Sequence, residues 1–342
     1  MGEAGDGGGE TGALDSGDVD EAPIDLTVER VELDGACTRV TIVSVEGVQS
    51  ERSFVLVAGV GVAATYFEFL APALARHGTV YALDLPGFAG MPRPRGNEQP
   101  TAAFFARQVS HVLDRYELEN PVLLGHSMGT QVVTEVLAAH PELAHAVLVS
   151  PVVNDAERAA PVQAVRFAQA GVHESVHLVL TALSAYILCG VAYFLTVLPH
   201  LLSYPIVARI GGVRASVLFI RGEFDRTSPR RFHSRLVAAV GAERSRRWEI
   251  EEAAHSIING HALGVAELTL GHVRGTLARR GRMPSAEAAV PPARHADLAL
   301  VLRALGSRAA EWGAALRGDD AAVGRAKREH AKLLWHAYTR RR

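Results

Sequence analysis

"PVLLGHSMGTQVVTEVLAAH", Pro121 to His140, joins an apolar run to a helical pattern through one short turn. The run "PVLLG" suits a strand buried on both faces, and "TQVVTEVLAAH" has the spacing of an amphipathic helix. Between them, Gly125 and Gly129 flank Ser127. A serine on a sharp strand-to-helix turn needs small neighbours, because the backbone is strained and the chains pass closely. The stretch therefore predicts a serine hydroxyl that projects from the end of a sheet, although the letters "GHSMG" alone also occur in ordinary glycine-rich turns.

A serine at such a turn acts as a nucleophile only with a base and an orienting acid. Asp225 follows the apolar run "SVLFIRG", and His255 follows "RRWEIEEA". The order serine, aspartate, histidine is one of the known chain orders of a catalytic triad. His255 would take the proton of Ser127, and Asp225 would hold the imidazole tautomer. Asp155, which follows "AVLVSPVV", is an alternative acid, and we prefer Asp225.

Short apolar runs and helical patterns alternate on both sides of this stretch. The runs "SFVLVAG", "TVYALDLPG" and "AVLVSPVV" suit strands of a parallel sheet that is covered on both faces. Two earlier segments, "IDLTVERVELDG" and "TRVTIVSVEG", alternate apolar and polar residues as antiparallel edge strands do. The pattern predicts an α/β fold with a mostly parallel sheet, flanked by helices, whose active residues lie on loops at the carboxyl ends of the strands.

The chain divides into four predicted parts. We expect a disordered acidic tail over residues 1–22, an α/β core over 23–154 and 213–280, a helical cap over 155–212, and a linker with extra helices over 281–342. The linker is "RMPSAEAAVPPAR". The next segment places a row of apolar residues on one helical face: Leu298, Val301, Leu302, Leu305, Trp312 and Leu316. A second helix should follow from Asp320. We expect its basic end to be exposed to solvent rather than to contact anionic lipid or a partner.

Composition excludes several classes of protein. The 342 residues carry a formal net charge of −2, which gives no electrostatic reason to expect nucleic acid as a partner. Cys37 and Cys189 cannot form a disulfide framework. The N-terminus lacks the basic and apolar regions of a signal peptide, so we expect a cytoplasmic protein, with membrane association left open. We expect no cofactor and no metal, because no P-loop, dinucleotide fingerprint or metal-ligand spacing is present.

The stretch from Ser175 to Ala208 contains no Asp, Glu, Lys or Arg, and it is long enough to cross a bilayer. A single crossing would separate Ser127 from Asp225 and His255, which must meet at one sheet. We therefore expect no single transmembrane span, but two short cap helices, "SVHLVLTALSAYIL" and "VAYFLTVL". They would form an apolar lid over a lipophilic substrate, touch a membrane surface peripherally, or simply pack on the core.

The chain from about residue 50 to 280 resembles the α/β-hydrolase superfamily, in its cap-bearing branch. "VLVAGVG", "LDLPGFAG", "GHSMG", "GEFDRTSP" and "AAHS" occur in the order and at the spacing of that family. The resemblance implies an oxyanion hole formed by the backbone N–H groups of Val60 and Met128. The chain departs from the family pattern in two places. It has Ala58-Gly59 where many relatives have His-Gly, and its stretch "DLPGFAGMPRP" lacks the usual Ser or Thr a few residues after the glycine.

Together, the residue patterns and the family resemblance predict a serine hydrolase that cleaves an ester, or a thioester, of a lipophilic small molecule through an acyl-enzyme. We expect four residues to contact the substrate: Gly59, His126, Tyr186 and Tyr193. Hydrolysis of a carbon–carbon bond and cofactor-free perhydrolysis use the same triad, so the residues do not separate them from ester hydrolysis. A non-catalytic member that keeps the fold to bind lipid or a partner is the remaining alternative.

Overall fold

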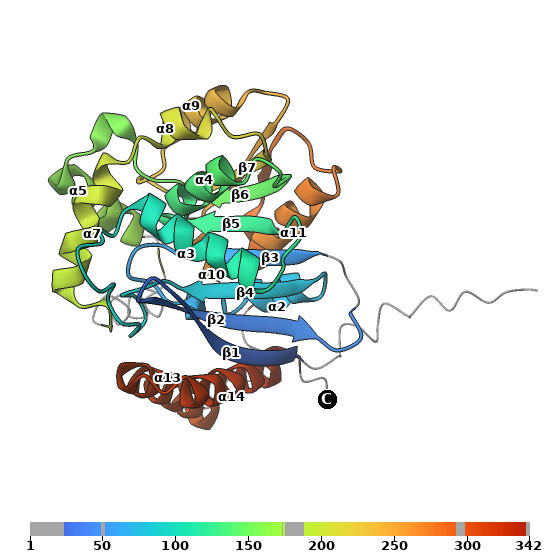
Figure 1. The fold of residues 1–342 in the computed structure, drawn as a ribbon. Coiled ribbons are helices and arrows are strands. Elements are labelled where there is room, and N and C mark those ends of the chain that lie inside the picture. The colour runs from blue at the N-terminus through green and yellow to red at the C-terminus, as the bar shows by residue number, and fades with distance from the viewer. Residues whose placement is uncertain (1–23, 49–51, 173, 175–187, 292–297, 340–342) are drawn as a thin grey trace, which may run out of the picture.

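A nine-stranded sheet runs through the centre of the molecule (Figure 1). The computed structural model describes residues 24–48, 52–172, 174, 188–291 and 298–339. The strand order is β1-β2-β4-β3-β5-β6-β7-β8-β9. The strands are β1 (Ile24–Leu33), β2 (Ala36–Val45), β3 (Ser53–Val57), β4 (Thr79–Asp84), β5 (Val122–His126), β6 (His145–Val149), β7 (Ser216–Gly222), β8 (Ser245–Ile250) and β9 (Arg280–Met283).

The first two strands are antiparallel and the rest of the sheet is parallel. β1 pairs with β2 and β2 with β4 in antiparallel register, whereas each pairing from β4 through β3 to β9 is parallel. The predicted fold class is thereby confirmed, and the two N-terminal segments are antiparallel as predicted. Only β1 lies at the edge of the sheet, because β2 is paired on both sides, with β1 and β4. The parallel strands all end at one edge, so the loops that follow β3, β5, β7 and β8 gather there.

Two hydrophobic layers cover the sheet, because successive residues of a strand point to opposite faces. In β3, Val55 and Val57 belong to one buried cluster, and Phe54 and Leu56 belong to the other. The first layer contains α3 (Ala102–Arg115), α4 (Gly129–Ala139), α8 (Ile206–Ile210) and α9 (Arg230–Val240). The second contains α2 (Leu70–Ala75), α10 (Ile257–Gly260) and α11 (Ala262–Val273), together with the 3₁₀ turn η1 (Ala64–Phe67).

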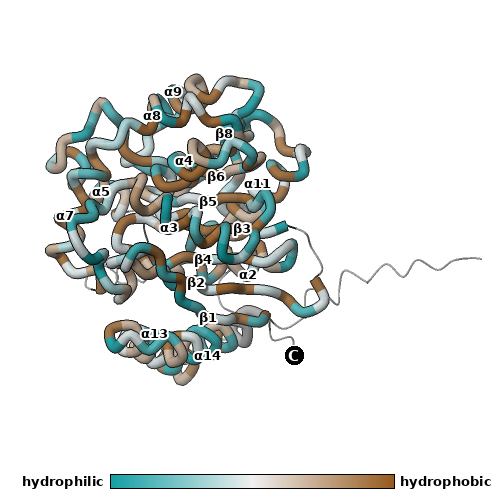
Figure 2. The backbone as a smooth tube through the Cα atoms, viewed as in Figure 1, coloured by the Kyte–Doolittle hydropathy of each residue, from teal (hydrophilic) through white to brown (hydrophobic). Residues whose placement is uncertain are grey.

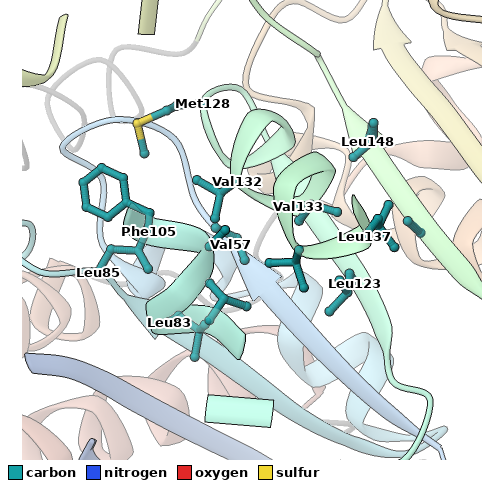
Figure 3. Packing of buried hydrophobic residues seen from close by; sticks show 14 of the residues in the cluster. Val57, Leu83, Leu85, Phe105, Leu123, Met128, Val132, Val133, Leu137 and Leu148 are labelled. Atoms are coloured by element: carbon teal, nitrogen blue, oxygen red, sulfur yellow. The ribbon is translucent and has the colours of Figure 1, made fainter. Parts of the chain in front are cut away.

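The flanking helices are amphipathic in the way that this arrangement requires. Figure 2 shows hydrophobic and hydrophilic positions alternating along the elements that surround the sheet. Figure 3 shows Val132, Val133 and Leu137 of α4 against Val57 and Leu123 of the sheet. α4 is therefore held firmly at the position where it follows β5, and its first turn has a fixed place at the edge of the sheet.

The ninth strand corrects the predicted boundary at residue 281. Arg280–Met283 pairs in parallel with β8, followed by α12 (Ser285–Ala288), where "RMPSAEAAVPPAR" suggested a linker. The strand has no apolar alternation because it lies at the edge of the sheet and only Met283 is buried. Gly281 leaves room for the neighbouring indole, since a Cβ there would lie 2.5 Å from Cη2 of Trp248.

The cap joins β6 to β7 through α5 (Ala160–Gly171), α7 (Val191–Ser203) and α8, with a short 3₁₀ turn η2 (Asp155–Glu157) at its start. The first predicted cap helix, "SVHLVLTALSAYIL", lies outside the described residues except for its last position. The second begins at Val191 as predicted, but continues through Pro199, because Leu201 and Leu202 beyond it pack onto the core. Among the described helices, none has the length and apolarity needed to cross a membrane.

Two antiparallel C-terminal helices, α13 (Leu298–Arg317) and α14 (Asp320–Thr339), pack beside β1 (Figure 1). Their contact with the core combines a small apolar cluster against β1 with several ion pairs. Arg308 pairs with Glu68, and Asp320 pairs with Arg30 and with the fully buried Arg39. The predicted apolar face of α13 is instead turned to solvent at four positions, which are between 43% and 68% exposed: Val301, Leu302, Leu305 and Leu316.

Candidate active site

Ser127 occupies the turn between β5 and α4 in a left-handed backbone conformation, with φ of +53°. Its N–H donates to the carbonyl of Val149 at 3.0 Å. The flanking glycines have no room for a side chain. A Cβ on Gly129 would lie 2.1 Å from the Val57 oxygen, and one on Gly125 would lie 2.4 Å from the Gly129 oxygen. The close passage of chains expected from the sequence is therefore present, and it presents the serine at the start of a helix.

Asp225 lies in the loop after β7 and is fully buried. Its Oδ1 accepts hydrogen bonds from the backbone N–H of Thr227 at 3.0 Å and from the Thr227 hydroxyl at 2.6 Å, while Oδ2 lies 3.0 Å from Nδ1 of His255. Burial opposes ionisation, but the charge of His255 and these hydrogen bonds outweigh it, so the pKa of Asp225 is held well below its ordinary 3.8. The carboxylate is charged and fixed in place.

His255 lies in the loop after β8 and is also buried. Burial lowers its pKa, but the neighbouring Asp225 carboxylate more than compensates, with a smaller contribution from Glu174, and the pKa lies above the ordinary 6.5. Because Nδ1 faces the Asp225 carboxylate, it carries the proton, which leaves Nε2 of the neutral ring as the acceptor. That tautomer is the one required of a general base.

Two residues hold this pair in place that the sequence interpretation did not single out. The Thr227 hydroxyl lies within hydrogen-bond distance of both Asp225 and Nδ1 of His255, at 2.6 and 2.8 Å. The buried Arg221 donates to the backbone oxygens of Asp225 and Ser228, at 2.9 and 2.8 Å. A threonine two residues after an aspartate is a recognisable turn signal, whereas nothing local announces the role of Arg221.

The alternative acid lies away from His255. Asp155 pairs with Arg235 on α9, with its Oδ2 at 2.6 Å from Nη2. Both side chains are partly exposed, and the pair fastens the start of the cap to the core. Of the two acids considered from the sequence, only Asp225 has a hydrogen bond to His255 in the described part of the chain.

The turn after β3 lies against the serine. A Cβ on Gly59 would be 3.2 Å from Cβ of Ser127, so the glycine permits close approach of the two loops. Val60 lines the cavity above the serine, and Met128 precedes α4, where backbone N–H groups lack helical partners. Ala58, which precedes Gly59, is buried in the core.

His126 is buried beside His255, with ring centroids 5.0 Å apart. Its Nε2 lies 3.0 Å from the His255 carbonyl oxygen, and because a carbonyl only accepts, this nitrogen carries the proton. Burial and the neighbouring His255 lower the pKa of His126 to about 3, so the ring is neutral. It lines the cavity and positions the loop that carries His255.

A cavity of about 690 Å³ lies over these residues and is mostly apolar. Its walls include Ser127 and His255, although neither His255 nor Asp225 has a hydrogen bond to the Ser127 side chain in the described residues. The cap contributes Phe167 of α5 and four residues of α7 to the walls: Phe194, Leu198, Leu201 and Leu202.

One predicted substrate contact falls elsewhere. Tyr193 is not among the residues that line the cavity; its hydroxyl donates to the Pro86 carbonyl at 3.1 Å and its ring packs on Phe88. The helical face that carries Tyr193 points to the core, because Gly87 leaves the space that the ring fills. Tyr186 lies outside the described residues. Gly59 and His126 do line the cavity.

Comparison with known proteins gives a consistent picture of the chain. A family model described as the alpha/beta hydrolase family matches residues 54–268. No curated protein sequence matches the chain. Within the described residues no cluster of His, Cys, Asp or Glu could hold a metal ion.

Solved structures with this arrangement include three hydrolases. A carboxylesterase from Bacillus subtilis has a TM-score of 0.61 and 18% identity, covering 76% of this chain and 95% of its own. A bacterial membrane phospholipase A has a TM-score of 0.59 and 18% identity, with coverages of 73% and 86%. A 2-hydroxy-6-oxo-6-phenylhexa-2,4-dienoate hydrolase from Rhodococcus has a TM-score of 0.59 and 14% identity, with coverages of 74% and 100%. Identities this low show a shared fold alone.

Proposed function

The chain belongs to the alpha/beta hydrolase family, and on that premise we propose that it is a serine hydrolase acting on an ester or thioester with a lipophilic part. One observation carries the proposal. Ser127 lies in the same apolar cavity as His255, and His255 is hydrogen-bonded at 3.0 Å to a fully buried carboxylate, Asp225. A buried, ionised aspartate on Nδ1 supports a general base at the other ring nitrogen.

In the proposed reaction, Ser127 attacks the substrate carbonyl carbon while His255 takes the hydroxyl proton. The tetrahedral oxyanion would accept hydrogen bonds from the backbone N–H groups of Val60 and Met128. The imidazolium, stabilised by Asp225, then gives its proton to the departing alcohol or thiol, and the acyl group remains on the serine. Water, deprotonated by His255, attacks the acyl-enzyme and releases the carboxylic acid, which returns the enzyme to its starting state.

The cavity walls support a lipophilic substrate. Most side chains from α5 and α7 that line it are aliphatic or aromatic, so an alkyl chain would bury its surface there at about 25 cal/mol per Å². Phe167 and Val172 line this cavity and are also largely exposed, and Val165, Val191 and Leu195 are further exposed apolar residues of the cap. We therefore place peripheral membrane contact, if the substrate is a lipid, at the cap.

The experiment is labelling with a fluorophosphonate probe followed by peptide mapping. We expect the label on Ser127, and loss of labelling in Ser127→Ala. Ser256 lines the same cavity and serves as the internal control. A label on Ser256, or equal labelling of wild type and Ser127→Ala, would contradict the mechanism.

Hydrolysis of nitrophenyl esters of increasing chain length tests the substrate class. We expect kcat/KM to rise with chain length and to fall roughly a thousandfold or more in Ser127→Ala. Equal rates for the two proteins would favour a non-catalytic binding module. A flat dependence on chain length would remove the argument from the apolar cap.

A further inference from the structure

The cavity over Ser127 contains a carboxylate but no cation. Among its lining residues in the described part of the chain, Glu174 has the only carboxyl group, and no Lys or Arg is present. Burial raises the pKa of this carboxyl above its ordinary 4.5, whereas the Ser256 N–H and the neighbouring His255 favour its charged form. The cap sequence from residue 175 to 208 adds no Lys, Arg, Asp or Glu.

Glu174 is fixed beside the proposed base. Its Oε1 accepts a hydrogen bond from the backbone N–H of Ser256 at 2.7 Å, and Ser256 directly follows His255. The negative charge of Glu174 is also one of the causes that raise the pKa of His255. The hydrogen bond to Ser256 holds the carboxylate in the wall of the cavity, next in sequence to the proposed base.

A fixed negative charge in an apolar cavity discriminates between substrates by their charge. An anionic group entering the cavity would lose its hydration, find no Arg or Lys to pair with, and repel Glu174. A neutral chain of the same size meets none of these costs, and a cationic group would be attracted.

We propose that Glu174 is a specificity-determining residue that restricts the site to substrates whose acyl chain carries no anionic group. The inference rests on the proposed hydrolase function and narrows it to neutral or cationic esters. Dicarboxylate monoesters, and other substrates with an acidic group near the scissile bond, should be hydrolysed at least tenfold less efficiently.

The test compares three esters of equal length: nitrophenyl hexanoate, the mono-nitrophenyl ester of adipic acid, and nitrophenyl 5-(trimethylammonio)pentanoate. For the wild type we expect kcat/KM for the hexanoate to exceed that for the adipate by at least tenfold. In Glu174→Gln the adipate-to-hexanoate ratio should rise about tenfold, and the ratio of the cationic ester to the hexanoate should fall. Ratios measured on one enzyme cancel differences in folding and in the reactivity of His255.

Glu157→Gln is the matched control, because Glu157 is a cap carboxylate paired with Arg166 and does not line the cavity. Its ratios should equal those of the wild type. Equal hydrolysis of hexanoate and adipate by the wild type, or unchanged ratios in Glu174→Gln, would overturn the inference while leaving the hydrolase intact. Failure of the wild type to hydrolyse even the hexanoate, with Ser127 unlabelled, would overturn the proposed function and this inference with it.

Discussion

Replacing Arg308 with methionine should loosen the attachment of the two C-terminal helices. The guanidinium contacts Glu68 and also donates to Glu311 at 2.7 Å, and the side chains of Arg308 and Glu68 are only 14% and 12% exposed. The substitution removes the principal cation beside Glu68, and breaking a buried ion pair costs about 3–5 kcal/mol. The pKa of Glu68 gives a similar figure. Burial raises it, but Arg308 and then His330 outweigh burial and lower it from 4.5 to about 2, which corresponds to about 3 kcal/mol.

The free energy of unfolding, measured by urea denaturation with tryptophan fluorescence, should therefore fall by about 3 kcal/mol in Arg308→Met. Arg303→Met is the control on the same helix, because Arg303 pairs with Glu329 at the surface and its loss should cost no more than about 0.5 kcal/mol. The double variant Glu68→Gln with Arg308→Met should recover part of the loss, since no unpaired carboxylate remains.

The pH dependence of the free energy of unfolding follows from the same pair of residues. Because the pKa of Glu68 is lowered on folding, its contribution is present above about pH 4.5 and is lost as the pH falls toward 2. The wild type should therefore lose more stability than Arg308→Met over this interval. Equal destabilisation by Arg308→Met and Arg303→Met, or a double variant as unstable as Arg308→Met alone, would refute the reasoning.

Three further predictions concern the site and the cap. Asp225→Asn should lower kcat by roughly 10⁴-fold, whereas Asp155→Asn should leave kcat nearly unchanged; similar losses of kcat in both variants would contradict the assignment of Asp225 as the acid of the triad. Since the pKa of His255 is raised and the neutral ring is the base, kcat/KM should fall as the pH drops through a value above 6.5, and Asp225→Asn should move this inflection to lower pH; an unmoved inflection would assign it to another group. Gly87→Ala places a Cβ 2.1 Å from the ring of Tyr193, and this overpacking should lower the free energy of unfolding by about 1–3 kcal/mol more than Gly96→Ala does. Gly96→Ala is the control, because it introduces the same backbone strain at a positive φ without a nearby side chain; equal unfolding midpoints for the two variants would show that the ring moves freely.

The parts of the site that were predictable each follow a parallel strand. Ser127 and Asp225 come after the apolar strands β5 and β7, whereas the strand before His255, β8, carries three charged residues among its six. Parallel strands bring their carboxyl ends to one edge of the sheet. β9 could not be predicted in this way, because its sequence has no apolar pattern. The strand is held by its hydrogen-bonded pairing with β8 rather than by burial of its side chains.

Contacts between distant single charges were beyond prediction from local pattern. Glu68 and Arg308 are 240 residues apart, and each looks like an ordinary surface residue of an amphipathic segment. Glu174 is equally inconspicuous, because it becomes significant only when the cap folds over Ser256. The predicted contact between Tyr193 and the substrate did not hold for a related reason. A helical pattern identifies which residues share a face, but it does not say whether that face meets the core or the cavity.

The polar attachment of the C-terminal helices also sets where the protein could be shortened. Asp320 is one of two carboxylates on the fully buried Arg39, with Asp84 as the other, and Arg308 is the principal cation on Glu68. A version cut before α13 would keep every strand and every proposed catalytic residue, yet it would leave charges in the interior without their counterparts. We therefore expect the core to need α13 and α14 for its full stability, and a boundary drawn at the end of the family match, residue 268, would remove both helices.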